Sequence, residues 1–252
     1  MTTALITGAS SGIGEEFARQ LAARGADLVL VARDREALDA LAARLGAVYR
    51  VDCEVLVADL AKPRHVSKVV DRLVDPDRPV EVLVNNAGFG LPLAFERNDI
   101  QDEARHLAVH VEAPMRLSHA ALEGMLARGH GRIVNVASVA AFIPRSTYGA
   151  VKSWVVSFSR WANGAYRSRG VVVTAVCPGF THTNFHARLG LPPGQEGVPS
   201  FMWLDASTVV GQALRDCARG RAVSIPSLRY EVMVAAARLL PGLATRIARR
   251  GR

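Results

Sequence analysis

A glycine-rich turn near the start of the chain decides the fold: residues 7–14 read Thr7-Gly8-Ala9-Ser10-Ser11-Gly12-Ile13-Gly14. An apolar stretch over residues 3–7 precedes the turn and predicts a strand, and helical periodicity over residues 12–24 follows it. Glycines let the backbone turn tightly and approach a pyrophosphate, which the positive N-terminus of a helix attracts. The simpler interpretation is a strand-to-helix connection without a ligand, but this strand and helix context favours a dinucleotide site.

The rest of the chain repeats the alternation of strand and helix. Apolar runs such as Leu28–Val31 do not alternate with polar residues, as is typical of parallel strands covered on both faces. We therefore predict an α/β fold, a Rossmann-type doubly wound parallel sheet of about seven strands in a single domain. Strands are expected at 3–7, 27–32, 52–58, 80–84, 132–137, 171–177 and 222–225, and helices at 12–24, 34–46, 64–74, 99–128, 146–168 and 205–219.

The predicted domain covers residues 1–226 and carries both the dinucleotide site and the catalytic groups. Its 252-residue chain, half of it hydrophobic, is long enough to bury a sizeable core. A Pro- and Gly-rich stretch at 180–204 is expected to be a substrate loop, since long irregular segments in compact domains are usually lids or binding loops. Residues 227–252 are predicted to form a basic, amphipathic helical tail.

Cysteine usage and hydropathy limit the classes of protein. Cys53, Cys177 and Cys217 are widely spaced and form no Cys-x-x-Cys pair, so we expect neither a disulfide framework nor a metal site. We find no signal peptide, and charged residues interrupt every apolar run before it reaches the roughly 18 residues of a spanning helix. These features predict a cytoplasmic protein, at most peripheral to a membrane.

The net charge of +8 is concentrated at the C-terminal end, where residues 227–252 hold six arginines and one glutamate. A nucleic-acid surface would spread basic residues over one face among aromatic ones, which we do not find, so no nucleic acid partner is expected. The tail can pack on the protein's own core or on a second subunit, or it can lie on an anionic membrane. Its apolar stripe comprises Tyr230, Val234, Ala237, Leu240, Leu243 and Ile247.

Further motifs follow the glycine turn in a set order: Asp59, Asn85-Asn86-Ala87-Gly88, Ser138, Tyr148, Lys152, Pro178-Gly179 and Thr183. With the T-G-x-x-x-G-x-G spacing they resemble the short-chain dehydrogenase/reductase family over about residues 3 to 225, and more loosely its ketoacyl and hydroxysteroid reductases. The resemblance implies a Rossmann-type fold, a nicotinamide cofactor and an oxidoreductase that forms a homodimer or homotetramer. Each motif alone has a simpler interpretation, such as a turn or a strand end, but their common order favours the family.

Tyr148 and Lys152 are the candidate proton-transfer groups. They lie four residues apart, so on a helix they share one face. A nearby ammonium favours the phenolate, and we expect it to lower the pKa of Tyr148 from about 10 toward working pH. Ser138, after the fifth strand, is expected to donate a hydrogen bond to the same substrate oxygen. Taken alone, the Tyr–Lys pair would be an ordinary helix surface pair.

The resemblance implies the cofactor contacts. Lys152 would hold the nicotinamide ribose, Asp59 the adenine and Thr183 the carboxamide, with Asn85 lining the cleft. Asp59 can instead cap the next turn, and Asn85 can satisfy backbone groups between strands. The full cofactor-binding set is Gly8, Ser10, Ser11, Gly12, Ile13, Gly14, Arg33, Asp59, Asn85, Ala87, Gly88, Tyr148, Lys152, Pro178, Gly179 and Thr183.

The chain departs from the family at His110. The family usually has an Asn there, whose backbone carbonyl orders a proton-relay water. A backbone carbonyl does not depend on residue type, and imidazole forms hydrogen bonds much as an amide does. His110 is therefore a catalytic candidate, with simple packing between helices as the alternative.

Arg33 indicates the choice of cofactor. NAD enzymes of this geometry place a carboxylate near the end of the second strand, whereas a 2′-phosphate favours an arginine. This chain has Ala32 followed by Arg33, and Asp34 is better explained as the N-cap of the next helix. The sequence therefore predicts NADP, as NADPH, although Ser11 stands where many NADP enzymes have a basic residue.

The predicted substrate is a lipophilic small molecule, because the residues near the site are rich in apolar side chains. A 3-oxoacyl thioester fits this lining, with a steroid or another lipophilic ketone as the alternative. An epimerase or dehydratase would need a longer chain, and a catalytically idle NADP-binding protein would not need the intact catalytic residues. The expected lining is Phe89, Leu91, Leu93, Phe95, Phe180, Phe185, Leu189, Leu191, Phe201, Met202 and Trp203.

Overall fold

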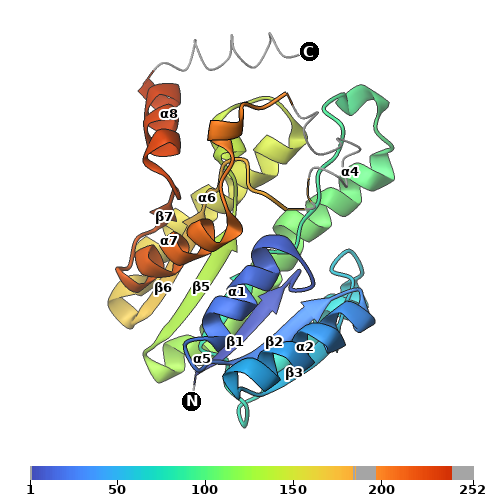
Figure 1. Ribbon diagram of the computed structural model, residues 1–252, viewed down its shortest axis with the longest axis vertical. Helices are drawn as coiled ribbons and strands as arrows, with labels where there is room; N and C mark the ends of the chain where they lie inside the picture. The colour runs from blue at the N-terminus through green and yellow to red at the C-terminus, as the bar shows by residue number, and fades with distance from the viewer. Residues whose placement is uncertain (1, 184, 186–196, 240–252) are drawn as a thin grey trace.

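The computed structural model describes residues 2–183, 185 and 197–239 (Figure 1). In this part of the chain seven parallel strands form one sheet in the order β3-β2-β1-β4-β5-β6-β7, which confirms the predicted doubly wound sheet. The strands are β1 (Thr3–Thr7), β2 (Asp27–Ala32), β3 (Cys53–Val57), β4 (Val82–Asn85), β5 (Gly131–Val136), β6 (Val171–Val176) and β7 (Val223–Ser224).

Helices cover both faces of the sheet because its central strands are apolar on both sides (Figure 1). Along β2, Leu28 and Leu30 pack into the core on one face, whereas Val29 and Val31 pack into the core on the other. The helices are α1 (Gly12–Ala22), α2 (Arg35–Tyr49), α3 (Pro63–Leu73), α4 (Ile100–Leu107), α5 (Ala113–Arg128), α6 (Thr147–Tyr166), α7 (Ala206–Ala218) and α8 (Leu228–Leu239). Among the described residues no helix is both long and apolar enough to span a bilayer.

The helical segment predicted over residues 99–128 is confirmed, but it contains a π-helical turn that was not predicted. Helices α4 and α5 are separated by a π-helical turn, Ala108–Glu112. Pro114 has no N–H, so the carbonyl of His110 cannot accept the α-helical hydrogen bond that residue 114 would otherwise donate. π-Helical turns are frequent at functional sites, and this one carries His110.

The order of the strands creates the crevice for a ligand. The chain leaves β1 toward β2 on one side, and later returns to place β4 on the other side of β1. In open α/β sheets the ligand lies beyond the carboxyl ends of the strands at such a reversal. The glycine turn follows β1 at this point, so the topology places it at the crevice.

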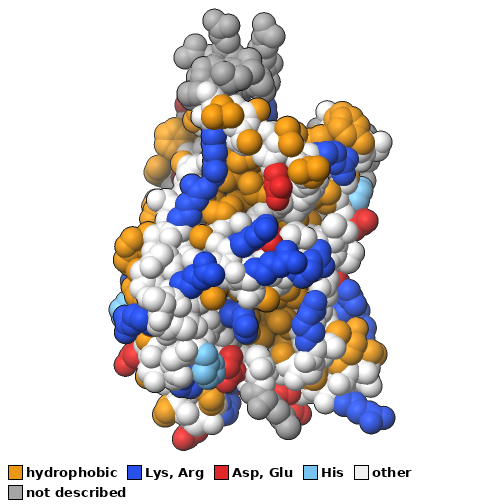
Figure 2. All heavy atoms as spheres, turned by 90° about the vertical axis from the view of Figure 1, so that its left-hand side faces the viewer, with side chains coloured by type: hydrophobic (Ala, Val, Ile, Leu, Met, Phe, Trp, Pro, Cys, Tyr) orange, Lys and Arg blue, Asp and Glu red, His pale blue; other side chains and the backbone are white. Residues whose placement is uncertain are grey.

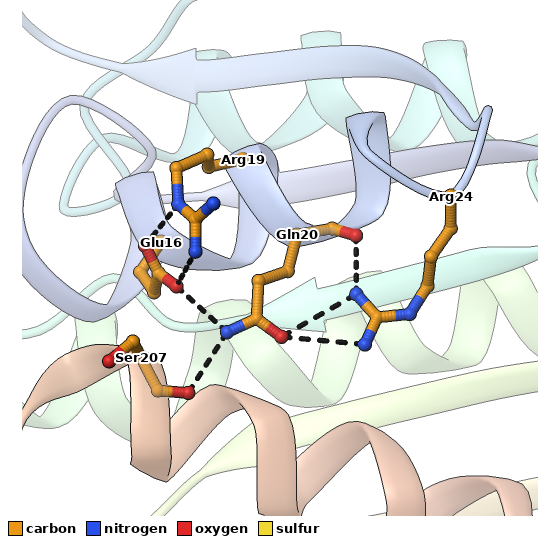
Figure 3. A network of polar contacts seen from close by, with 5 residues as sticks. All are labelled: Glu16, Arg19, Gln20, Arg24 and Ser207. Carbon is orange, nitrogen blue, oxygen red and sulfur yellow. Dashed lines mark hydrogen bonds and ion pairs between the residues drawn. The ribbon is translucent and has the colours of Figure 1, made fainter. Parts of the chain in front are cut away.

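Polar contacts join α1 to α7 over the face of the sheet (Figure 3). The side-chain amide of Gln20 donates to the carbonyl of Ser207 at 2.9 Å and to Glu16 at 2.7 Å. Arg19 forms an ion pair with the same glutamate, and Arg24 donates to Gln20. The contacts align α7 with the first helix, whose N-terminus opens at the crevice.

Helix α8 connects the C-terminal segment to the loop after β6. Tyr230 and Val234 are buried, so this part of the predicted stripe packs on the protein itself, while Leu240, Leu243 and Ile247 lie outside the described residues. The Tyr230 hydroxyl donates to the carbonyl of Met202 at 2.7 Å and accepts from the Phe180 N–H at 3.1 Å. One tyrosine therefore holds both ends of the predicted substrate loop.

We expect Gly179→Ala to destabilise the protein, because a Cβ at residue 179 would lie 1.9 Å from the ring of Tyr230. Overpacking of this kind typically lowers the free energy of unfolding by about 1–3 kcal/mol. Urea denaturation measures the change. The matched control is Gly164→Ala in α6, where a Cβ would meet nothing within 4 Å; its helix propensity predicts a gain of up to about 1 kcal/mol. Equal stability of the two variants would contradict the proposed packing.

Candidate functional site

The glycine turn forms a cradle that side chains would fill. Gly8 and Gly12 have positive φ angles of 65° and 59°. A Cβ at Gly14 would lie 2.2 Å from the carbonyl oxygen of Gly8, so only glycine fits there. Ser10, Ser11 and Ile13 complete the turn into the N-terminus of α1, where helix N–H groups attract an anion. This geometry fits the pyrophosphate of a dinucleotide.

Asn86 holds this cradle, although the predicted contact set does not include it. Its side-chain amide donates to the carbonyls of Thr7 at 3.0 Å and Gly8 at 3.2 Å. The Thr7 hydroxyl in turn accepts from the N–H groups of Asn86 and Ala87. These bonds join the carboxyl ends of β1 and β4. The signal was present in the sequence, since Asn86 lies inside the Asn-Asn-Ala-Gly motif.

The loop after β6 lies beside the same turn. A Cβ at Gly12 would be 3.1 Å from the Thr183 methyl carbon, so the residue predicted to hold the carboxamide is close to the glycine motif. Pro178 and Gly179 lead into this loop, and its ends are joined by hydrogen bonds from His182 N–H to Leu204 and from Leu204 N–H to Phe180. The fold thus brings together motifs far apart in the sequence.

Arg33 and Asp59 follow neighbouring strands β2 and β3. Arg33 is exposed directly after β2, beside Asp34, which caps α2 by accepting from the Ala37 N–H at 3.1 Å, as predicted. Asp59 is half-buried and accepts from the Ala61 N–H at 3.1 Å, which is its alternative role as a cap. The exposed guanidinium is free to meet a phosphate, whereas one Asp59 oxygen already bonds the backbone.

Ser138, Tyr148 and Lys152 come together beyond the end of β5. Ser138 begins the short η3 helix (Val139–Phe142), and Ser146 caps α6 so that Tyr148 enters in its first turn. Ser138 is close enough to Tyr148 to oppose the rise of its pKa, and the Lys152 ammonium lies 5.6 Å from the centre of the tyrosine ring. The sequence predicted that Tyr148 and Ser138 would act on one substrate oxygen, with Lys152 beside the tyrosine.

The expected lowering of the Tyr148 pKa is wrong for the cofactor-free protein. Burial raises the pKa of Tyr148 to about 12, against a smaller opposing effect of the hydrogen bond with Ser138. Burial also lowers the pKa of Lys152 to about 7, and its ammonium donates to the carbonyl of Val136 at 2.7 Å. Desolvation disfavours both charged forms and outweighs the attraction between them.

His110 is buried in the π-helical turn and packs against the backbone after β4. Its Nε2 lies 3.1 Å from the nitrogen and 2.8 Å from the carbonyl oxygen of Phe89, so it accepts from one or donates to the other according to its tautomer. A Cβ at Gly88 would lie 2.5 Å from the imidazole, which explains the glycine there. Burial holds the pKa of His110 well below its usual value, so the ring is neutral.

A small cavity lies between His110 and Lys152. Its volume of about 10 Å³ suits one water molecule, and its lining includes Lys152 and Pro114. Asn85, which also lines it, donates to Ser118 and Asn135. Asn85 Oδ1 and His110 Nδ1 are buried and have no hydrogen-bond partner among the described residues. Polar atoms of this kind favour an internal water.

His106 was not predicted, although it lies four residues before His110. Its ring is 4.4 Å from that of His110 and 6.0 Å from that of Tyr148, measured between centres. Burial lowers the pKa of His106, against the opposing effect of Glu103. Two neutral imidazole rings, those of His106 and His110, therefore lie next to the Tyr148 ring. The i, i+4 spacing was the available signal.

Only part of the predicted apolar lining lies near Tyr148. The Phe185 ring is 5.8 Å from the Tyr148 ring, and Phe89 contacts His106 and His110. Phe95 and Phe201 are instead more than half exposed, at 56% and 62%. Leu91 and Leu93 are also accessible to solvent. Phe180 and Met202 pack against the core, and Trp203 stacks on His182. Leu189 and Leu191 lie outside the described residues.

We expect Lys152→Met to remove a pH dependence from the stability of the cofactor-free protein. Between pH 7 and 9 the unfolded chain binds a proton at Lys152 that the folded chain does not, so the free energy of unfolding rises with pH in that window; above pH 9 the raised pKa of Cys177 opposes this rise. The methionine variant should lack this rise and be more stable than the wild type near pH 7. Denaturant unfolding across the window measures both effects. Lys68→Met, at an exposed site, should keep the wild-type slope; an unchanged slope in Lys152→Met would contradict the assignment.

Comparison with known proteins agrees with this geometry. Residues 2–192 match the family model described as short chain dehydrogenase. The structure of a short-chain dehydrogenase from Sphingobium yanoikuyae in complex with NADPH is 36% identical, covers 96% of each chain and superimposes with a TM-score of 0.85. A bulky-bulky ketone specific alcohol dehydrogenase from Comamonas testosteroni is 34% identical, with a TM-score of 0.81 and coverage of 96% of this chain and 94% of that one.

Among curated proteins, a very-long-chain 3-oxoacyl-CoA reductase from Anas platyrhynchos is 32% identical over 71% of this chain and 60% of its own. The chain spans between 54% and 60% of the length of three of the curated relatives it matches. The match of the family model to most of the chain, and the similarity to an NADPH complex over nearly its whole length, support a nicotinamide cofactor. The chain belongs to the short-chain dehydrogenase family.

Proposed function

We propose that this protein is an NADPH-dependent oxidoreductase that reduces a carbonyl group on a lipophilic substrate. The observation that carries the proposal is the grouping of Ser138, Tyr148 and buried Lys152, whose ammonium lies 5.6 Å from the centre of the tyrosine ring, at the same edge of the sheet as the glycine cradle. The cradle would hold the pyrophosphate, and Tyr148 and Lys152 would contact the nicotinamide end of the cofactor.

The raised pKa of Tyr148 favours the reductive direction. At neutral pH the phenol keeps its proton, so it can donate that proton to a carbonyl oxygen as negative charge develops there. Ser138 would donate a second hydrogen bond to the same oxygen. When bound, the nicotinamide would supply the hydride for the carbonyl carbon. The product is then a secondary alcohol, and Tyr148 must recover a proton.

Lys152 would return that proton and recover one from a water held by the His110 carbonyl. The pKa of Lys152, about 7, allows its amine to give up and take back a proton near neutral pH. Lys152 and His110 line the same cavity, and Pro114 leaves the His110 carbonyl without its usual helical donor. A water in this cavity would connect the lysine to that carbonyl. Because a backbone carbonyl would hold the water, a histidine can replace the family's Asn at residue 110.

The exposed guanidinium of Arg33 supports NADPH over NADH. It follows β2, where a carboxylate would otherwise accept from the ribose hydroxyls, and Asp34 is already engaged as a helix cap. An arginine there pairs with a 2′-phosphate through charge-assisted hydrogen bonds.

A 3-oxoacyl thioester is the substrate class that we favour. Phe89 and Phe185 give an apolar surface beside Tyr148, and one relative is named for a 3-oxoacyl-CoA substrate. A bulky lipophilic ketone is the alternative, supported by the name of the Comamonas testosteroni enzyme. An idle binding protein is disfavoured by the intact Ser138, Tyr148 and Lys152.

We expect Tyr148→Phe to lower turnover at least about 100-fold, the usual scale for a lost general acid, with little change in NADPH affinity. NADPH oxidation with 3-oxoacyl thioesters and lipophilic ketones measures turnover, and fluorescence titration measures affinity. Tyr166→Phe, at the far end of the same helix, is the matched control. Retained activity in Tyr148→Phe would refute the mechanism.

We expect Arg33→Ala to weaken NADPH binding by about 1.5–3 kcal/mol, the contribution of a hydrogen bond to a charged group, and to leave NADH binding almost unchanged. Parallel titrations with both cofactors measure the difference. Arg169→Ala, an exposed arginine before β6 at the opposite edge of the sheet, controls for the lost charge. Equal losses for the two cofactors would show that Arg33 does not select between them.

A further inference from the structure

A second hollow lies outside the active site, between η3, α6 and α8. Its volume is about 260 Å³. One face of α6 supplies four residues at helical spacing, and η3 and α8 close the sides. Figure 2 shows the side of the molecule on which α8 lies, where basic side chains gather around hydrophobic surface with few acidic ones between them. The groove is lined by Ala141, Phe142, Ser153, Val156, Ser157, Arg160 and Arg238.

Two arginines face this groove without a carboxylate. Neither Arg160 nor Arg238 has an ion-pair partner among the described residues, and no acidic residue lines the groove. The pKa of Arg238 is lowered, first by burial and then by the charge of Arg160. The two guanidiniums therefore repel each other across the groove. An anion between them would relieve this repulsion, and a doubly charged anion would do so best.

The groove also fixes one guanidinium and offers an apolar surface. Arg238 lies over the Phe142 ring, 4.5 Å from its centre, so a cation–π contact restricts its position. Ser157 is exposed at the groove and adds a hydroxyl donor, whereas the Ser153 hydroxyl already donates to the carbonyl of Ala141. Phe142 and Val156 provide hydrophobic contact beside these polar groups.

We propose that this groove binds the phosphate group of an amphiphile, with the guanidiniums of Arg160 and Arg238 on the phosphate and the apolar chain along Phe142. Arginine suits phosphate because its planar fork forms two parallel hydrogen bonds. The same chemistry occurs in a free alkyl or acyl phosphate and in a phosphate headgroup at a membrane surface. This site is separate from the nicotinamide crevice and does not depend on the proposed reaction.

The experiment uses the full chain and dodecyl phosphate below its micelle concentration, followed by calorimetric titration. Dodecyl maltoside, an uncharged amphiphile with the same chain, tests the need for phosphate, and inorganic phosphate serves as the competitor. Sedimentation with phosphatidylcholine vesicles, with and without phosphatidic acid, tests the membrane source. Two variants are compared with the wild type. The double variant Arg160→Gln/Arg238→Gln removes both positive charges, and the single variant Ser157→Asp places a negative charge in the groove.

We expect the wild type to show one saturable site for dodecyl phosphate or for vesicles containing phosphatidic acid. Both variants should bind the same probe with an affinity at least about tenfold lower, since a hydrogen bond to a charged group contributes at least this factor. Arg169→Gln with Arg219→Gln removes the same charge at exposed positions away from the groove and should bind as the wild type does. Absence of saturable binding to both probes, wild-type binding in the groove variants, or an equal loss in the control pair would each overturn the proposal.

Discussion

The close approach of two backbone segments at the start of the chain is the constraint on which the site depends. Gly14 lies so close to the carbonyl of Gly8 that no side chain fits at residue 14. The Asn86 side chain donates hydrogen bonds to the carbonyls of Thr7 and Gly8. These contacts place the N-terminus of α1 at the crevice between β1 and β4. The cradle is therefore built by a pair of strands that are neighbours in space and distant in the sequence.

Burial then determines the protonation states of Tyr148 and Lys152. A tyrosine and a lysine one helical turn apart would, at a surface, favour each other's charged forms. Here desolvation dominates, so the phenol keeps its proton and the amine gives one up near neutral pH. Both shifts agree with the proposed proton donation from Tyr148 to a carbonyl oxygen. The environment of the two residues, more than their mutual distance, sets their protonation states.

The segments around the site are held by a few long-range contacts of similar kind. Tyr230 joins α8 to both ends of the predicted substrate loop, and His110 joins the π-helical turn to the backbone of Phe89. In both places a glycine, Gly179 or Gly88, provides the space for the ring. Glycines in this protein thus serve close packing of aromatic rings as well as the approach to the cofactor.

Residue patterns predicted the seven strands, the glycine cradle, the helix cap at Asp34 and the grouping of Ser138, Tyr148 and Lys152, because periodicity and motif spacing are local properties of the chain. The same patterns did not predict the π-helical turn between α4 and α5, although Pro114 was visible, since helical periodicity continues across it. They also missed Asn86 and His106 as neighbours of the site. Only the tertiary structure decided the pKa directions, the anchoring of α8 by Tyr230 and the presence of both Arg160 and Arg238 in one groove. These properties depend on which groups lose water and which distant segments meet, and neither is encoded in the spacing of residues along the chain.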